Sequence, residues 1–314
     1  MEIWGKDHLN DVAVSTAHEY RQKVKTYIVP VLGQIKLQKL TFLMVQSFVN
    51  SLTAPKESGG RGLSHKYARD IFGVLHKSLE KAVDAKLIPS NPSNNCSLPR
   101  LDDIPHEHYE EAQLIAFITA IQSHIHENYY LTLLLTGMRE AEPLGLTWKN
   151  VDFDRGVIHV RQQLQRNRDT GVYELVTPKR QEFRTLPMGS ELCNILKAQR
   201  QEVQRRKEIC GSSWIDKDLV FPNPVGDFLS YRTVYDCYKR IVAKLGFPDL
   251  RVHDLRHAYT TLALGNGDDI KTVQTLLGHK TPEFTLKVYA HSTDAAKQKS
   301  GERMDEALRQ LRGQ

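Results

Sequence analysis

The 314-residue chain has no long hydrophobic runs and few cysteines. Apolar stretches such as Phe42–Val45 and Leu131–Leu135 are far shorter than the roughly 20 residues a membrane-spanning helix needs, so no membrane partner is expected. The first residues lack the basic and then apolar layout of a signal peptide. Four cysteines stand at wide, irregular spacings without a CxxC pair: Cys96, Cys193, Cys210 and Cys237. A disulfide framework or a structural zinc site is therefore not expected, and a reducing cytosol fits best.

Motifs for nucleotide hydrolysis and zinc proteolysis are missing as well. The sequence contains no GxxxxGK[ST], no GxGxxG and no HExxH, so neither chemistry has support. The balance of 40% hydrophobic and 25% charged residues is that of a globular protein, which disfavours a disordered tail, a collagen-like fibre and a coiled-coil rod. The length is sufficient for two domains, each with its own core.

The surplus of positive charge lies in the first third of the chain. Lys and Arg number 43 against 37 Asp and Glu, which gives a net charge of +6. Residues 1–100 hold 14 basic and 8 acidic side chains, whereas residues 101–314 hold 29 of each. An excess confined to one part indicates a nucleic-acid-binding module joined to a second unit.

Apolar residues at three- and four-residue spacing predict helices in this first part, over Val12–Tyr27, Thr41–Leu52 and Ser64–Ala85. The glycine-rich Lys56–Gly62 predicts a flexible loop. Ser64 is a candidate N-cap for the third helix. One face of that helix is apolar, with Ile71, Leu75, Leu79 and Ala82. The opposite face is basic, with Lys66, Arg69, Lys77 and Lys81. Such a face can simply be solvated, but together with the uneven charge it favours contact with DNA.

A proline-rich stretch, Pro89–Pro105, predicts an extended linker and a domain boundary. The pattern beyond it predicts helices over Glu110–Ser123 and Tyr129–Thr136. Alternating runs then predict a small antiparallel sheet, with strands Val157–Leu164, Val172–Val176 and Arg184–Pro187. From Leu192 onward the pattern is mainly helical again.

Residues that could carry chemistry gather in four clusters of this second part. The first, TGMREAEPLGLTW, places Arg139 in the first turn of a predicted helix, with Glu142 at i+3 and close enough to orient the guanidinium. The second, TPKRQEFRTLP, sets Lys179 in or beside the hairpin turn that precedes Arg184.

The third cluster, HDLRHAYTT, puts His253 and Arg256 on one helical face, and the fourth, LLGHKTPEFTLKVYAH, holds His279 and Tyr289. Taken singly, each cluster has an ordinary structural explanation, such as a surface ion pair or a core tyrosine. In this order and spacing, the Arg…Lys…HxxR…LGH…Tyr series resembles the tyrosine recombinase family, the integrases of bacteriophages and mobile elements. The resemblance covers residues 101–314 and extends more loosely to the helical first hundred residues.

The resemblance implies a site-specific recombinase that cuts and rejoins DNA. Arg139 and Arg256 would grip the phosphate through planar forks, which lysine cannot imitate. Tyr289 would attack phosphorus and form a 3′-phosphotyrosyl link. Lys179 would protonate the departing 5′-oxygen, although the adjacent Arg180 leaves the choice of general acid open.

Three further roles follow from the same resemblance. His253 would assist proton transfer at the tyrosine, His279 would hydrogen-bond the phosphate, and Glu142 would support the geometry of the histidine and the arginines. No metal and no cofactor are expected. Pro143 stands where the family usually has a leucine, but it should fit, because the first turn of a helix lacks internal N–H partners.

The expected fold is mainly α with a small antiparallel β-sheet. It comprises a helical, SAM-like core-binding domain over 1–95, a linker over 96–108, an α+β catalytic domain over 109–291 and a tail helix over 292–314. The chain starts almost directly with the core-binding helices, so the arm-binding domain that many integrases carry is expected to be absent or removed.

The partners expected from the resemblance are double-stranded DNA core sites, further copies of the chain in a tetramer built through the tail, and host DNA-bending or excision factors. The expected location is the bacterial cytoplasm, at the nucleoid. Two other functions stay open at this point. One is a type IB topoisomerase, which shares the tyrosine and arginine chemistry, and the other is a DNA-binding accessory protein with a silent active site.

Overall fold

The computed structural model describes residue 4, residue 12, residues 14–101, 109–178 and 183–278, and residue 309. The chain forms two compact units, the first made of residues 1–105 with 167–172 and the second of the remainder. Each unit has its own hydrophobic core. Among the described helices, none is long and apolar enough to cross a membrane.

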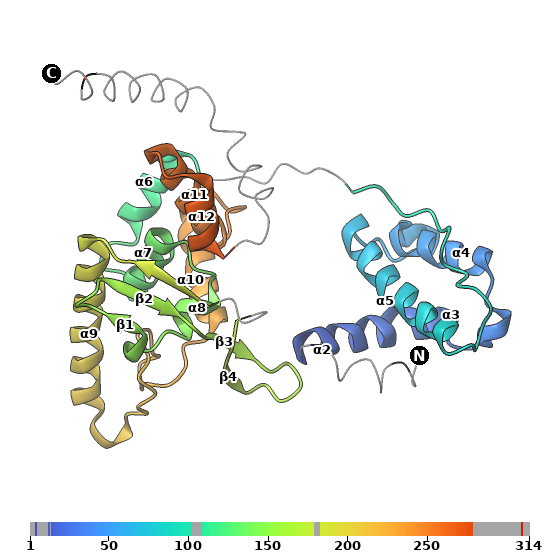
Figure 1. Ribbon diagram of the computed structural model, residues 1–314, viewed down its shortest axis with the longest axis horizontal. Coiled ribbons are helices and arrows are strands. Elements are labelled where there is room, and N and C mark those ends of the chain that lie inside the picture. Colours follow the sequence, from blue (N-terminus) through green and yellow to red (C-terminus); the bar gives the residue numbers. More distant parts are fainter. Residues whose placement is uncertain are drawn as a thin grey trace. The chain divides into compact units, whose positions relative to one another are not determined.

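The first unit is helical, as the sequence predicts (Figure 1). Thr41 and Ser64 begin its two longest amphipathic helices, because their side-chain oxygens accept hydrogen bonds from the main-chain amides of Met44 and Tyr67. The predicted glycine-rich loop starts with a 3₁₀ turn instead of being irregular throughout. The elements in order are α2 (Val14–Lys23), the π-helical turn η1 (Val24–Ile28), α3 (Val29–Leu32), η2 (Leu37–Lys39), α4 (Phe42–Thr53), η3 (Lys56–Ser58) and α5 (His65–Asp84).

Helix α5 has the two faces that its sequence predicts. The apolar residues of one face are all buried in the core of the first unit: Ile71, Leu75, Leu79 and Ala82. On the other face, Lys66, Lys77 and Lys81 are exposed, and Arg69 is half-buried. The core therefore fixes which side of α5 is turned to solvent.

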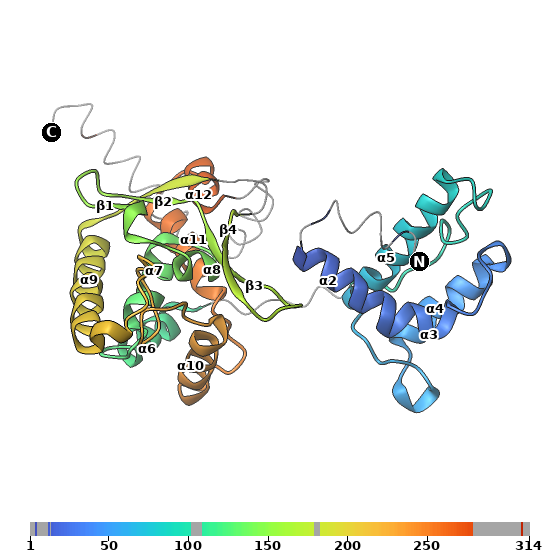
Figure 2. The same cartoon turned by 90° about the horizontal axis from the view of Figure 1, so that it is seen from below.

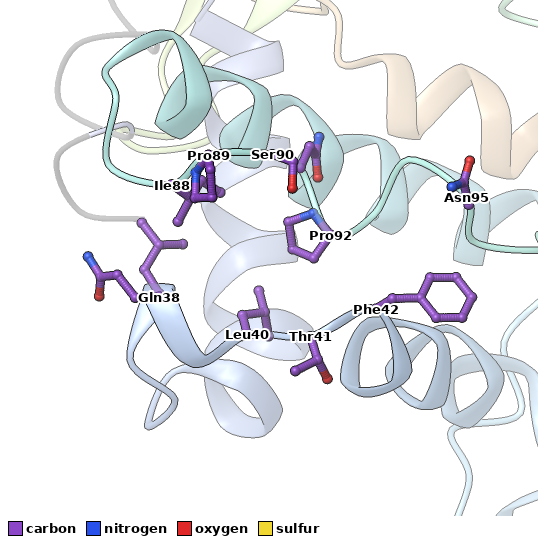
Figure 3. Close-up of a pocket in the computed structure, with 11 residues that line it drawn as sticks. Gln38, Leu40, Thr41, Phe42, Ile88, Pro89, Ser90, Pro92 and Asn95 are labelled. Atoms are coloured by element: carbon purple, nitrogen blue, oxygen red, sulfur yellow. The ribbon is translucent and has the colours of Figure 1, made fainter.

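The segment that follows α5 is not the extended linker that the prolines predict: it contains bends over residues 87–90 and a turn over residues 92–95, and its described part packs on the helices. Asn91 is buried and donates from Nδ2 to the carboxylate of Glu80 at 2.5 Å. Arg69 donates to the carbonyl of Pro99 at 3.0 Å. A cavity of about 500 Å³ lies between this segment and the start of α4 (Figure 3). Its lining includes none of the predicted site residues that the structure describes.

The second unit combines helices with short strands, and both views show α9 along one edge of it (Figures 1 and 2). Helix α7 packs against α9 and α11, and α12 packs against α11 and β5. The elements in order are α6 (Glu111–Ala120), α7 (Glu127–Thr136), α8 (Ala141–Leu144), η4 (Trp148–Asn150), β1 (Val151–Asp152), β2 (Val157–Val160), β3 (Gln163–Arg166), β4 (Tyr173–Val176), β5 (Arg184–Pro187), α9 (Ser190–Cys210), η6 (Gly211–Ser213), α10 (Tyr231–Lys244), α11 (Asp254–Asn266) and α12 (Ile270–Leu277).

The strands form two small antiparallel sheets, where the sequence predicts one. Strands β1, β2 and β5 pair in that order, and β3 pairs with β4. The run predicted as a single strand is broken after Val160, and β2 and β3 belong to different sheets. In the break, Gln162 donates from Nε2 to the carbonyl of Gly145 at 2.8 Å. A Cβ atom on Gly145 would lie 2.7 Å from the amide nitrogen of Leu164, so only glycine lets α8 approach β3 this closely.

Candidate active site

Arg139 lies in the short turn that joins α7 to α8. Helix α7 ends at Thr136 and is capped by Gly137 in a left-handed conformation (φ 60°), and α8 begins at Ala141. Arg139 therefore precedes the helix, and the prediction that it lies in the first turn is wrong by a few residues. Its amide donates to Glu142 Oε2 at 2.7 Å and its Nη1 to Oε1 at 3.3 Å, so the predicted orienting role of Glu142 has a structural basis.

Glu142 is fully buried and shared between two arginines. Besides Arg139, it accepts two hydrogen bonds from Arg184, Nη1 to Oε1 at 2.9 Å and Nη2 to Oε2 at 2.6 Å. Burial by itself raises the pKa of this carboxyl, but the bonds and charges of Arg184 and Arg139 outweigh it and hold the pKa below its ordinary value. Glu142 is therefore a carboxylate at neutral pH. Pro143 fits α8 as expected and is buried.

Sequence reasoning missed Arg184 as a member of the site. Arg184 and Leu186 lie two positions apart on β5, so their side chains point to the same face of the strand. Leu186 is buried, with 2% exposure. The Arg184 side chain is itself only 6% exposed. A charged residue that shares the buried face of a strand needs a partner inside the protein, and this register was the signal that could have identified it.

Arg256 is 3% exposed in the middle of the unit, on α11. Its Nη1 donates to the carbonyl of Gly137 at 2.5 Å, and its Nη2 donates to the carbonyl of Leu277 at 2.7 Å. Burial, and next the positive charge of Arg139, lower the pKa of Arg256 to about 9. Main-chain oxygens therefore fix the plane of this guanidinium. Because two positive charges lie close together here, a bound anion would be stabilised.

The carboxyl end of α12 is the meeting point of the three arginines. Successive carbonyl oxygens each accept from one guanidinium: Leu276 from Arg184 at 2.7 Å, Leu277 from Arg256 at 2.7 Å and Gly278 from Arg139 at 3.1 Å. The last carbonyls of a helix have no partner within the helix and carry partial negative charge, so they suit cationic donors. The structure thus brings Arg139, Glu142 and Arg256 together, as predicted.

His253 stands at the N-cap of α11, one turn before Arg256, and is half-buried. Its ring lies 5.0 Å from that of His257, edge to face. Burial, followed by the positive charge of Arg256, lowers the pKa of His253. At neutral pH the imidazole is therefore uncharged, with one ring nitrogen able to accept a proton.

The remaining predicted residues of the chemistry lie outside the described part of the chain: Lys179 with its neighbour Arg180, His279 and Tyr289. The described chain stops at Pro178 and resumes at Phe183, so Lys179 and Arg180 fall between the two described ranges. An open hollow of about 580 Å³ is lined by His159, Arg161, Phe183, Arg184 and Thr185. Within the described residues, no three His, Cys, Asp or Glu side chains lie together as metal ligands.

The basic residues of α5 are accessible but already have neighbours. Lys77 donates to the hydroxyl of Tyr20 at 3.0 Å, and Lys81 pairs with Asp84 at 3.1 Å. Arg69 holds the segment after the helix through Pro99. The contacts of Lys77 and Lys81 are exposed and therefore weak in water, so these two cations can exchange them for an anionic partner.

The two units match two family descriptions. Residues 107–296 match the phage integrase family, and residues 1–53 match the phage integrase N-terminal SAM-like domain. Since the first match covers more than half of the chain, the chain belongs to the phage integrase family of tyrosine recombinases, which are site-specific DNA recombinases. The predictions of family, fold class and enzyme type are confirmed.

Individual relatives agree with this assignment. A tyrosine recombinase XerC-like protein of Caldanaerobacter subterraneus subsp. tengcongensis is 25% identical over 275 residues, which span 82% of this chain and 68% of that protein. The transposase from transposon Tn916 of Enterococcus faecalis is 32% identical over 200 residues, 59% of this chain and 47% of that protein.

Solved structures show the same fold. The integrase of transposon Tn1549 in complex with a circular intermediate DNA superposes with a TM-score of 0.77 at 22% identity, over 95% of this chain and 96% of that chain. A lambda integrase dimer bound to a core site gives a TM-score of 0.65 at 17% identity, over 92% and 94% of the two chains.

Proposed function

We propose that this recombinase exchanges strands between double-stranded DNA core sites of a mobile element through a 3′-phosphotyrosyl intermediate on Tyr289. The observation that carries the proposal is the pair of arginines, Arg139 and Arg256, whose forks are held by Glu142 and by main-chain carbonyls at the ends of α7 and α12. Two planar guanidinium groups fixed in this way suit the non-bridging oxygens of a phosphodiester. The Tn1549 and lambda integrases of the same fold were solved with DNA, which supports this substrate class.

The proposed reaction balances without an external energy source. The phenolic oxygen of Tyr289 forms a bond to phosphorus, and the bond from phosphorus to the 5′-oxygen breaks. Lys179 gives the leaving oxygen its proton, and His279 hydrogen-bonds the phosphate. A different 5′-hydroxyl then attacks the phosphotyrosine, so the second step reverses the first with exchanged strands.

His253 serves this reaction as an uncharged imidazole. Because its pKa lies below the ordinary value, the ring is neutral at the pH of the cell and can take the proton of Tyr289. A charged imidazole in the same place would have no nitrogen available as acceptor. Activity should therefore fall in acid as His253 becomes protonated.

The rest of the DNA contacts are proposed to be mainly electrostatic. The exposed cations of α5, Lys66, Lys77 and Lys81 with the half-buried Arg69, would meet the phosphate backbone of the core site. In the second unit, the hollow beside Arg184 carries Arg161 and is open to solvent, so a strand that leads to the scissile phosphate can enter there. Binding should depend strongly on salt.

The assembly on DNA is proposed to be a tetramer. Residues 292–314 place Met304, Ala307, Leu308 and Leu311 at helical spacing among charges, the pattern of a segment that packs on another surface. We assign this tail to a neighbouring subunit. Two duplexes with two cleaved strands each require four tyrosines, which four copies supply.

The test is a suicide substrate. A duplex is selected from a random pool by its binding to the full chain and is then nicked near its centre, so that the short cleaved strand diffuses away and traps the covalent product. The wild type and a Tyr235→Phe control, which alters a half-buried tyrosine of α10, should give a protein–DNA adduct under denaturing conditions. Tyr289→Phe should give none. An adduct that survives in Tyr289→Phe would remove the proposal, and relaxation of supercoils without strand exchange would favour a topoisomerase.

A further inference from the structure

Arg184 links three segments that are far apart in the sequence. From β5 it donates two hydrogen bonds to Glu142 on α8, at 2.9 and 2.6 Å, and one from Nε to the carbonyl of Leu276 at the end of α12, at 2.7 Å. Its side chain is 6% exposed. A lysine could not make this set of contacts, because its single nitrogen cannot span both carboxylate oxygens and a carbonyl in one plane.

The shared carboxylate gives this link an electrostatic consequence for Arg139. Glu142 bonds Arg184 at shorter distances than it bonds the guanidinium of Arg139, which lies 3.3 Å away. Arg184, which contacts both carboxylate oxygens, therefore balances most of the negative charge of Glu142. Without Arg184, the buried carboxylate of Glu142 would pair with Arg139 alone. Its negative charge would then offset the positive charge of the guanidinium that is to bind the phosphate.

The link to α12 adds a geometric consequence. Arg184, Arg256 and Arg139 bond three consecutive carbonyls, those of Leu276, Leu277 and Gly278. Gly278 ends the helix in a left-handed conformation (φ 68°), and the chain continues directly to His279. Loss of the first of the three bonds loosens the carbonyls on which the other two arginines rest.

We infer that Arg184 is a positioning residue of the recombination site, which holds Glu142 and the end of α12 so that Arg139 keeps its charge and its aim toward a bound phosphate. This rests on the proposed function as far as DNA cleavage is concerned. Any tetrahedral oxyanion between Arg139 and Arg256 would meet the same charges, so the role of Arg184 can be tested without DNA.

The experiment uses five variants of the full chain. Arg184→Met removes the charge at similar length, Glu142→Gln removes the carboxylate, the double variant removes both, and Arg155→Met alters an arginine whose side chain is 81% exposed. Arg184→Lys keeps the positive charge without the bidentate contact. It replaces Arg184→Met in the same measurements if that variant does not fold. Binding of orthovanadate is measured by calorimetry, and the rate of adduct formation is measured on the nicked duplex.

Arg184→Met should bind vanadate about tenfold more weakly, the size expected for one lost charge-assisted contact, and should form adduct more slowly with unchanged affinity for the duplex. The double variant should recover part of the vanadate affinity, because Arg139 is no longer neutralised while the bond from Arg184 to Leu276 stays lost. Arg155→Met should match the wild type. A double variant no better than Arg184→Met would overturn the inference and leave a packing role. Absence of any Tyr289-dependent adduct in the wild type would remove the proposed function, while the vanadate results would still decide the role of Arg184.

Discussion

Replacement of Glu142 by glutamine is expected to destabilise the second unit by about 3–5 kcal/mol, the range found when one member of a buried ion pair is removed. The side chain is fully buried and accepts two bonds from Arg184, at 2.9 and 2.6 Å, and two from Arg139, at 2.7 and 3.3 Å. Glutamine keeps one acceptor oxygen but points an NH₂ group at a guanidinium. Two cations then lose their shared countercharge.

The chain contains a matched control for this change. Glu202 on α9 also accepts from two arginines, Arg205 at 2.8 and 2.9 Å and Arg206 at 2.7 Å, but its side chain is 33% exposed. Glu202→Gln should cost about 0–1 kcal/mol, as exposed pairs do. For a unit of this size, calorimetry should show Glu142→Gln lowering Tm by roughly 6–20 °C. Equal losses in the two variants would refute the reasoning.

The pH dependence of the Glu142 effect provides an internal check. The folded pKa of Glu142 lies below its ordinary value, because the bonds from Arg184 and Arg139 outweigh the effect of burial. The stabilisation is therefore complete above the unfolded pKa and is lost as the pH falls through the folded pKa. The gap in Tm between wild type and Glu142→Gln should be constant near neutral pH and should narrow in acid. A gap that widens in acid would contradict the sign.

Three further outcomes are expected. Arg256→Lys should slow adduct formation by about 100- to 1000-fold with little change in DNA affinity, because one ammonium cannot reach both main-chain carbonyls and the phosphate. Single-turnover kinetics on the nicked duplex measure this rate, and a near-normal rate would contradict the expectation. Lys66→Ala should lower the slope of log affinity against log salt by about 1, and an unchanged slope would place Lys66 away from DNA. Deletion after Ser292 should preserve DNA binding but impair the tetramer in sedimentation, and an unaltered tetramer would contradict the role of the tail.

Local patterns were enough to predict α4 and α5 of the first unit. The helix α5 buries Ile71 and Leu75 and exposes Lys66, because helical spacing alone decides which residues share a face. The grouping of Arg139 with Arg256 could also be predicted, but through the order of motifs in a family. Periodicity alone has no information on residues that lie 117 positions apart in the chain.

Long-range contacts account for what the sequence did not show. The strand predicted through Leu164 is two strands, because β2 pairs with β1 and β5 while β3 pairs with β4 in a separate sheet. Arg184 was missed because its partners, Glu142 and Leu276, come from other elements. The buried register of β5 was the signal available, but it required knowing which face of the strand points inward.

The most direct test of the account is to identify the residue that carries DNA in the trapped complex. The adduct formed on a duplex with a labelled cleaved strand is digested with protease and nuclease, and the modified peptide is sequenced by mass spectrometry. We expect a nucleotide linked through its 3′-phosphate to Tyr289, on the peptide that follows Lys287. A nucleotide on any other residue, or a linkage through a 5′-phosphate, would contradict it.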